Sequence, residues 1–384
     1  MAIEPTKPAG SLSFRPPKGV VKYLLVSPTG FAGEVFLEDR LLLTHAFPIT
    51  NLEEQLAHPA LAASGYSRAF YVLGFPLRSK STSIGNDAFA EQIVSALSVF
   101  FGKRFDNLGI IELDGIHALP LFQGRIVSKF LEAGIWNNDP RADCDFGFRS
   151  AGRQLELQSF GTLAEKFLAA EDDKKWRFFL NSASFYLSAL RLCNVDLEKA
   201  YLDLVMALEV LAGYFTFSDK DLFEYDADLA KLFSDMEKAG LGGRIDFVKA
   251  RLFQIKRRVM LSVQELVTQE FFDRSEAKEP QYALKRDLFP KHISSAYELR
   301  SKYVHKGTPI GHLVQGLTQF SAEVNVGEIE GDLKKLHAQC PTFLGLERLV
   351  RFVLLRFICE SASISHPHLH GTSINKTAAS EDGA

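Results

Sequence analysis

The sequence contains few cysteines, and none of them belongs to a recognisable pair. Its four cysteines, Cys144, Cys193, Cys340 and Cys359, are scattered singly, and no Cys-x-x-Cys motif is present. This pattern argues against a disulfide framework or a cysteine metal site and is typical of reduced thiols in an intracellular protein. We therefore expect a cytoplasmic chain that needs neither a metal nor another cofactor.

Long hydrophobic runs are also missing. No stretch of about 18 uncharged apolar residues occurs, which is the length that a membrane span requires. The nearest candidate, Phe343–Ile358, carries four charged side chains at helical intervals and is typical of a buried helix. Residues 1–18 are rich in Pro and Gly and lack the apolar core of a secretory signal, so we expect an extended leader and no contact with a membrane.

Net charge is low, at −3, while 46% of the residues are hydrophobic. This combination excludes a largely disordered chain and a uniformly basic nucleic-acid coat protein. The charges are nevertheless uneven: Asp196–Glu237 holds eleven acidic and three basic residues, and Arg244–Lys306 holds fourteen basic and eight acidic ones. A solvated helix face and a polyanion site both explain the basic run, and the count alone does not separate them.

The pattern predicts an α+β protein of two domains. Residues 19–155 read as a mixed α/β domain of unknown role, with a helix over Asp87–Phe101. Four strands are expected there: Val20–Val26, Val35–Leu43, Ala69–Phe75 and Leu108–Leu113. Residues 156–363 read as an all-α bundle, and the polar tail 364–384 is expected to be disordered, although its alternate histidines leave weak metal binding as a minor alternative.

Helical periodicity predicts the elements of the bundle. The expected helices are Leu163–Ala170, Trp176–Arg191 behind an Asp172/Asp173 cap, Asp196–Gly213, Arg244–Val267, Ile293–Val304 and Leu344–Ser361. The segment Phe271–Pro290, which contains two prolines, is expected to be a loop.

The most informative stretch is Tyr297–Gly307, because it places Arg300 and His305 on one helix that ends at Gly307. A guanidinium binds phosphate oxygens with two hydrogen bonds, and an imidazole exchanges a proton near neutral pH. Together they suit phosphodiester chemistry without a metal. The alternative is structural, because basic side chains also stabilise the C-terminal end of a helix.

The spacing of this pair limits its geometry. Positions five apart lie roughly 140° apart around a regular helix, so Arg300 and His305 do not share a face. Convergence on one ligand therefore requires a frayed helix end or a second copy of the chain.

The helix ELRSKYVHKG, with the upstream DLVMALEVLAG and the downstream LGLERLVRFVLLRFI, resembles an Apea-like HEPN domain over approximately residues 160–362. HEPN domains are helical modules with an Arg-x(4–6)-His signature. Arg300 and His305 match that signature, Ser301 matches the polar position after the arginine, and Glu209 matches an acidic position of the second helix. One departure is that Lys306 separates His305 from Gly307, whereas the family usually places glycine directly after the histidine.

The resemblance implies an endoribonuclease that acts as a homodimer, with two Arg/His sets facing one another. His305 is then the general acid or base, Arg300 stabilises the phosphate, Ser301 orients it, and RNA cleavage leaves a 2′,3′-cyclic phosphate. For Glu209 we favour an ion pair, with Arg300 as the candidate partner, because an unpaired buried carboxylate is costly. Six basic side chains are candidates to guide RNA: Lys302, Lys306, Lys249, Arg251, Arg257 and Arg258.

Two functions remain open after this comparison. Family members often act as toxins or in antiviral defence, which favours a nuclease that is restrained by the N-terminal domain or by a regulatory partner bound to it. The alternative is a non-catalytic HEPN module that binds RNA or serves as a protein-interaction and dimerisation scaffold. An intact Arg/His pair favours the nuclease.

Overall fold

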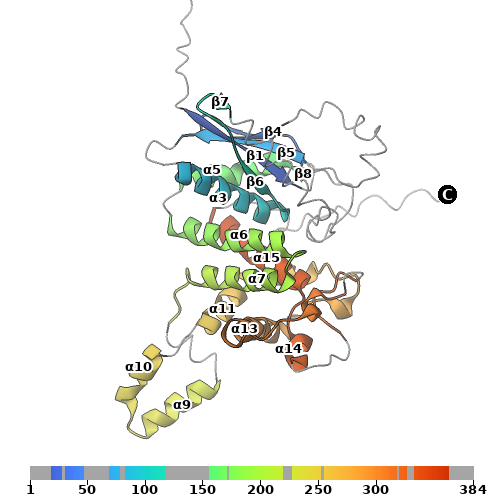
Figure 1. Ribbon diagram of the computed structural model, residues 1–384. Coiled ribbons are helices and arrows are strands. Elements are labelled where there is room, and N and C mark those ends of the chain that lie inside the picture. The colour runs from blue at the N-terminus through green and yellow to red at the C-terminus, as the bar shows by residue number, and fades with distance from the viewer. Residues whose placement is uncertain are drawn as a thin grey trace, which may run out of the picture.

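A computed structural model describes the chain over residues 19–27, 31–46, 69–77, 83–117, 155–170, 173–218, 227–251, 255–317, 320–326 and 333–362. The expected leader, 1–18, and tail, 364–384, lie outside these ranges, as does Cys144. The architecture is α+β: an antiparallel sheet lies at one end, and successive layers of helices follow it (Figure 1).

The main sheet has the strand order β3-β4-β5-β1-β6-β7, and every neighbouring pair is antiparallel. Its strands are β1 (Val20–Ser27), β3 (Val35–Leu37), β4 (Leu41–His45), β5 (Ala69–Pro76), β6 (Asp106–Leu113) and β7 (Ile116–His117). Two short strands, β2 (Phe31–Ala32) and β8 (Leu155–Glu156), pair in parallel beside it. The predicted strands over Val20–Val26, Ala69–Phe75 and Leu108–Leu113 are confirmed.

The single strand predicted over Val35–Leu43 is wrong. The segment forms a hairpin of β3 and β4, with Val35 opposite Leu43. The polar residues between the two apolar runs make the turn, and Asp39 adopts a positive φ of 45°, which aspartate tolerates better than most residues.

Alternation along β1 determines which sheet face is covered. Tyr23 and Leu25 belong to the main core, whereas Leu24 and Val26 belong to a small cluster with Leu108. The helices α3 (Ser83–Phe101) and α5 (Gly161–Ala169) lie beneath the sheet (Figure 1) and contact β6 and β3 respectively. The helix predicted over Asp87–Phe101 is therefore confirmed and starts one turn earlier.

The helical layers are built around the hairpin of α6 (Lys174–Leu192) and α7 (Leu197–Ala212). The helices α11 (Ile255–Leu266), α13 (Phe289–Lys306) and α15 (Phe343–Ala362) pack against it. The side chain of Asp173 accepts a hydrogen bond of 2.5 Å from the backbone N–H of Lys175, which confirms the predicted cap of α6. Shorter elements are α12 (Gln269–Asp273), α14 (Lys334–Gln339) and 3-10 turns at Leu157–Phe160, Pro280–Tyr282 and His312–Gln315.

Two predictions for the helical half need correction. Arg244–Val267 is not one helix but two, α10 (Gly242–Arg251) and α11. Their apolar residues are buried against different partners: Ile245 packs with Phe233 of α9 (Ala227–Lys238), whereas Val259 and Val263 join the main core. The segment Phe271–Pro290, which was predicted to be a loop, also contains most of α12. Phe271 of this helix is buried in the core.

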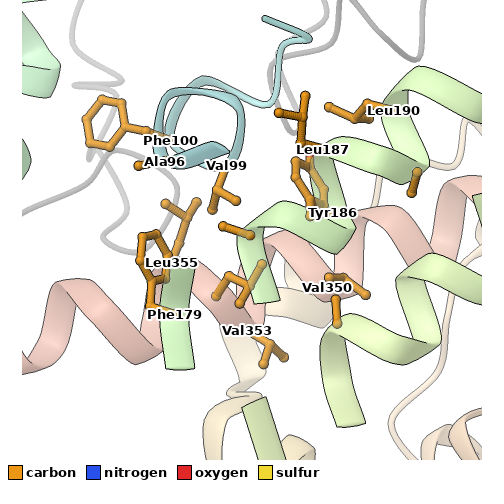
Figure 2. Packing of buried hydrophobic residues seen from close by; sticks show 14 of the residues in the cluster. Ala96, Val99, Phe100, Phe179, Tyr186, Leu187, Leu190, Val350, Val353 and Leu355 are labelled. Atoms are coloured by element: carbon orange, nitrogen blue, oxygen red, sulfur yellow. The ribbon is translucent and has the colours of Figure 1, made fainter. Parts of the chain in front are cut away.

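The sheet and the helices share one hydrophobic core. Side chains of α3, α6 and α15 interdigitate, including Val99, Phe179 and Val353 (Figure 2). Arg351 of α15 is fully buried and donates to the backbone carbonyls of Val99 and Phe100, at 2.7 Å each. These carbonyls belong to the last turn of α3, so the guanidinium caps the end of that helix. The division at residue 155 remains a prediction about sequence organisation, since packing is continuous across it.

Alanine at Gly102 is expected to lower the free energy of unfolding by about 2 kcal/mol. Gly102 has φ +65°, and an added Cβ would lie 2.5 Å from Nη1 and 2.7 Å from Cζ of Arg351. Gly115 is the matched control, because it has φ +83° and nothing within 4 Å of the added atom. Urea denaturation should show a larger loss for Gly102→Ala than for Gly115→Ala; equal losses would contradict a role for the Arg351 contact.

Candidate functional site

The candidate site lies along the second half of α13. Ile293, Ala296 and Leu299 bury one face of this helix. Its C-terminal end is Gly307, which adopts the left-handed conformation (φ 62°, ψ 20°), and the Gly307 N–H donates to the carbonyl of Tyr303 at 3.1 Å. The predicted C-cap is confirmed, and Lys306 between His305 and Gly307 does not prevent it. The last turn is consequently left at the surface.

Arg300 is held by α7. Its Nη2 donates to Oε2 of Glu209 at 2.9 Å and lies 3.3 Å from Sδ of Met206. The two charged side chains are 15% and 10% exposed. The ion pair expected from the sequence is therefore formed. Met206 was not expected at the site, although it precedes Glu209 by three residues, the spacing at which side chains share a helix face.

The pair leaves two polar atoms without partners. Nε of Arg300 and Oε1 of Glu209 are buried and have no hydrogen-bond partner among the described residues. Burial raises the pKa of Glu209, and the Arg300 guanidinium opposes this by favouring the charged carboxylate. The guanidinium carbon also lies 5.8 Å from the centre of the Tyr297 ring. The site thus holds a desolvated charge pair whose donors are not all used.

The raised pKa of Glu209 predicts a pH dependence. A carboxyl that binds its proton more tightly in the folded state makes the unfolding free energy fall as pH rises from about 4.5, its ordinary value, through the raised pKa. The difference in unfolding free energy between wild type and Glu209→Gln should fall over that range and then level off. Denaturant titrations at a series of pH values measure it.

Asp196 supplies a control of opposite sign. Hydrogen bonds from Lys199 lower the pKa of Asp196, so its contribution to stability is lost as pH falls. The difference between wild type and Asp196→Asn should therefore rise with pH in the acidic range. A Glu209 difference that rises in the same way would show that burial does not dominate at Glu209.

His305 is placed differently from Arg300. Its side chain is exposed in the last turn of α13, whereas Arg300 lies against α7, and no hydrogen bond or ion pair between them occurs in the described part of the chain. Ser301, between them, is partly buried. One chain therefore brings Arg300 to Glu209 but does not bring His305 to Arg300, in agreement with their angular separation.

The candidate RNA-guiding side chains fall into two groups. Lys302, which lies 3.9 Å from a Glu298 oxygen, and exposed Lys306 belong to α13, and Arg257 and Arg258 belong to α11, which packs against α13. Lys249 and Arg251 belong to α10, which projects with α9 from the body (Figure 1); their side chains lie outside the described set. Only the first group is placed on helices that pack around the candidate site.

The described residues contain no group of three or more His, Cys, Asp or Glu side chains that could hold a metal ion. In the same part of the chain, no helix has both the length and the apolar character needed to cross a membrane. Comparisons of the chain with protein-family models, curated proteins and solved structures find no match.

Proposed function

We propose that the chain is a metal-independent endoribonuclease of the HEPN type. The observation that carries the proposal is the arrangement of α13, which holds Arg300 in a desolvated ion pair with Glu209 and exposes His305 at a capped helix end. A permanent cation and a titratable imidazole that act on the same phosphate suit cleavage of a phosphodiester. The resemblance of this helix to the HEPN signature supports the same reaction.

The proposed reaction uses the RNA's own hydroxyl as nucleophile. His305 accepts the proton of a ribose 2′-hydroxyl, and the 2′-oxygen attacks the adjacent phosphorus. The bond to the 5′-oxygen breaks, and that oxygen takes up the proton that His305 gives back. The products are a 2′,3′-cyclic phosphate and a 5′-hydroxyl. Arg300 stabilises the negative charge that develops on the phosphate oxygens, and Ser301 orients them.

We assign this composite site to a homodimer. Because His305 and Arg300 lie on different sides of α13, His305 of one copy is proposed to act with Arg300 of the other across paired helix ends. Val304, beside His305, is 48% exposed and offers apolar area for such an interface. Lys302, Lys306 and Arg258 would then guide the RNA backbone. A toxin or antiviral role in the cytoplasm, restrained through the N-terminal part, completes the proposal.

The alternative function is a non-catalytic HEPN scaffold. The observation that favours it is the pairing of Arg300, whose guanidinium already has a carboxylate partner and is 15% exposed. A buried arginine in that state stabilises the contact between α7 and α13 whether or not RNA binds. The scaffold would still dimerise or bind RNA through the exposed end of α13.

The deciding experiment incubates the purified full chain with total RNA in excess chelator. The nuclease proposal expects cleavage that leaves 2′,3′-cyclic phosphate ends and that is lost in His305→Ala and reduced in Arg300→Ala. Intact RNA with wild type, or cleavage that persists in both variants, contradicts it. Dimerisation or RNA retention without cleavage, measured on the same samples, supports the scaffold.

A further inference from the structure

A methionine side chain contacts the guanidinium of the candidate site. Sδ of Met206, on α7, lies 3.3 Å from Nη2 of Arg300, and the same Nη2 donates to Glu209 at 2.9 Å. Because Met206 and Glu209 are three residues apart, one face of α7 presents a thioether and a carboxylate to one arginine. The proposed reaction gives Met206 no part, although it contacts the group that stabilises the phosphate.

The thioether is a weak partner for this guanidinium. A thioether sulfur accepts hydrogen bonds only weakly, so the Glu209 carboxylate is the strong acceptor that α7 offers to Arg300. Nε of Arg300 is buried and has no hydrogen-bond partner among the described residues. The same planar group therefore keeps an unused donor next to the nitrogen that contacts the sulfur.

Met206 is accessible to an oxidant. Its side chain is partly exposed, and it belongs to none of the hydrophobic clusters in the described part of the chain. Met260 of α11, by contrast, is 3% exposed and lies in the main core. Met236 of α9 is partly buried in the small cluster around Phe233. Because an oxidant must reach the sulfur, we expect Met206 and Met236 to react and Met260 to be protected.

Oxidation changes what Met206 offers to Arg300. When hydrogen peroxide reacts with a thioether, the O–O bond breaks, one oxygen bonds to the sulfur and the other leaves as water. The product is methionine sulfoxide, whose oxygen is a polar acceptor on the atom that already contacts the guanidinium. This oxygen can accept from Nη2 or from the unused Nε, and hydrogen bonds from a charged donor are the strong ones. After oxidation, α7 therefore holds Arg300 through two strong acceptors instead of one.

We propose that Met206 is a redox-sensitive switch of the candidate site, in which its sulfoxide binds Arg300 and withdraws the guanidinium from the RNA phosphate. The effect on cleavage rests on the proposed nuclease function, whereas the contact between the sulfoxide and Arg300 does not. Met206 acts through Arg300 and is therefore a positioning residue. A thiol-dependent methionine sulfoxide reductase removes the oxygen as water and restores the thioether, so the switch is reversible.

The test measures RNA cleavage by the full chain before and after treatment with hydrogen peroxide, while mass spectrometry follows the oxidation of each methionine. Conversion of Met206 to its sulfoxide should slow cleavage about tenfold, the factor that one hydrogen bond to a charged group contributes. Methionine sulfoxide reductase should restore the rate. The far-UV circular dichroism spectrum should stay unchanged, because the switch moves one side chain and unfolds no helix.

Variants assign the effect to one sulfur. Met206→Leu has no thioether, so peroxide should not change its rate, whereas the matched control Met236→Leu should be inhibited as wild type is. Met206→Gln carries an oxygen acceptor in place of the sulfoxide, so it should cleave slowly without peroxide and should not respond to it. In Arg300→Ala the residual cleavage should also be insensitive to peroxide, because the switch acts through that side chain.

A second readout needs no cleavage. Exchange of the Arg300 guanidinium protons with water, followed by NMR and assigned with Arg300→Lys, should slow in the oxidised chain because the sulfoxide accepts one of them. The same slowing should be absent from peroxide-treated Met206→Leu. If wild type cleaves no RNA, the nuclease proposal fails, and this exchange rate alone decides whether the sulfoxide binds Arg300.

Four outcomes would overturn the proposal. They are cleavage at the untreated rate with Met206 fully oxidised, equal inhibition of Met206→Leu, resistance of Met206 to a peroxide dose that oxidises Met236, and unchanged exchange of the Arg300 protons. A loss of helical signal that accompanies the loss of cleavage would also contradict it, because the inhibition would then come from unfolding.

Discussion

Replacement of His305 by alanine is expected to slow RNA cleavage by about 10²–10⁴-fold, the usual contribution of a general acid or base. The same change should leave the free energy of unfolding within about 0.5 kcal/mol of wild type, as is usual for exposed side chains. His305 is exposed in the last turn of α13 and has no hydrogen bond to another described residue. A large kinetic effect without a stability effect would therefore assign it to chemistry rather than to capping.

His312 provides the matched control for this experiment. It is a second exposed histidine, in the 3-10 turn His312–Gln315 that follows α13. His312→Ala should cleave RNA at the wild-type rate. Equal losses in both variants would indicate a general effect of surface charge, and a stability loss confined to His305→Ala would favour the capping role. Mixing His305→Ala with Arg300→Ala should restore part of the activity if two chains form one site.

Local patterns explain why much of this fold was predictable. Gly307 marks the C-terminal end of α13, and Asp173 marks the start of α6. Both helix caps could be predicted because a cap depends only on residues that are close in the sequence. The ion pair between Arg300 and Glu209 could also be predicted, because a Glu on an apolar helix face needs a buried cation as its partner. That argument identifies a partner only when few cations are candidates.

The features of the fold that could not be predicted from the sequence depend on contacts between residues that are far apart in the chain. The helices α10 and α11 are separate because α10 packs against α9, whereas α11 packs into the main core. The spacing of apolar residues does not show against which of these surfaces a helix packs. Arg351 sits in an apolar helix, yet its partners are backbone carbonyls 251 and 252 positions earlier.

The charged residues of α15 are a further case in which the sequence does not identify long-range partners. The sequence predicts a buried helix that carries charge, but it does not say which charges are satisfied. In the structure, Nε of Arg348 lies 2.7 Å from Oε1 of Glu323, and the two side chains are 3% and 0% exposed. Arg348 also donates to the carbonyl of Phe271 at 2.8 Å, and its guanidinium carbon lies 3.7 Å from the centre of the Phe271 ring.

Glu323 extends this network to the connecting segments. Its carboxylate accepts the backbone N–H groups of Glu276 and Leu284, at 2.8 and 2.9 Å. One buried carboxylate thus joins α15 to the segment between α12 and α13. Loss of either charged partner leaves the other desolvated and uncompensated, which is costly because the interior cannot replace the lost hydration.

Arg348→Met is expected to lower the free energy of unfolding by about 3–5 kcal/mol, the cost of an uncompensated buried charge. Arg356→Met is the matched control on the same helix. Arg356 is 20% exposed and pairs with Glu360 and Glu270 near the surface, so its loss should cost less than about 1 kcal/mol. Urea denaturation of both variants at neutral pH measures the difference.

A double variant separates the charge from the packing. Glu323→Gln removes the carboxylate charge but retains an oxygen that can accept a backbone hydrogen bond. In Arg348→Met/Glu323→Gln the uncompensated charge is absent, so the double variant should be more stable than the sum of the two single losses predicts. Additive losses would show that Arg348 acts through its contact with Phe271 rather than through Glu323. Because the network fixes the segment that leads into α13, a coupled pair would also make the position of the Arg300 helix depend on a charge buried in α15.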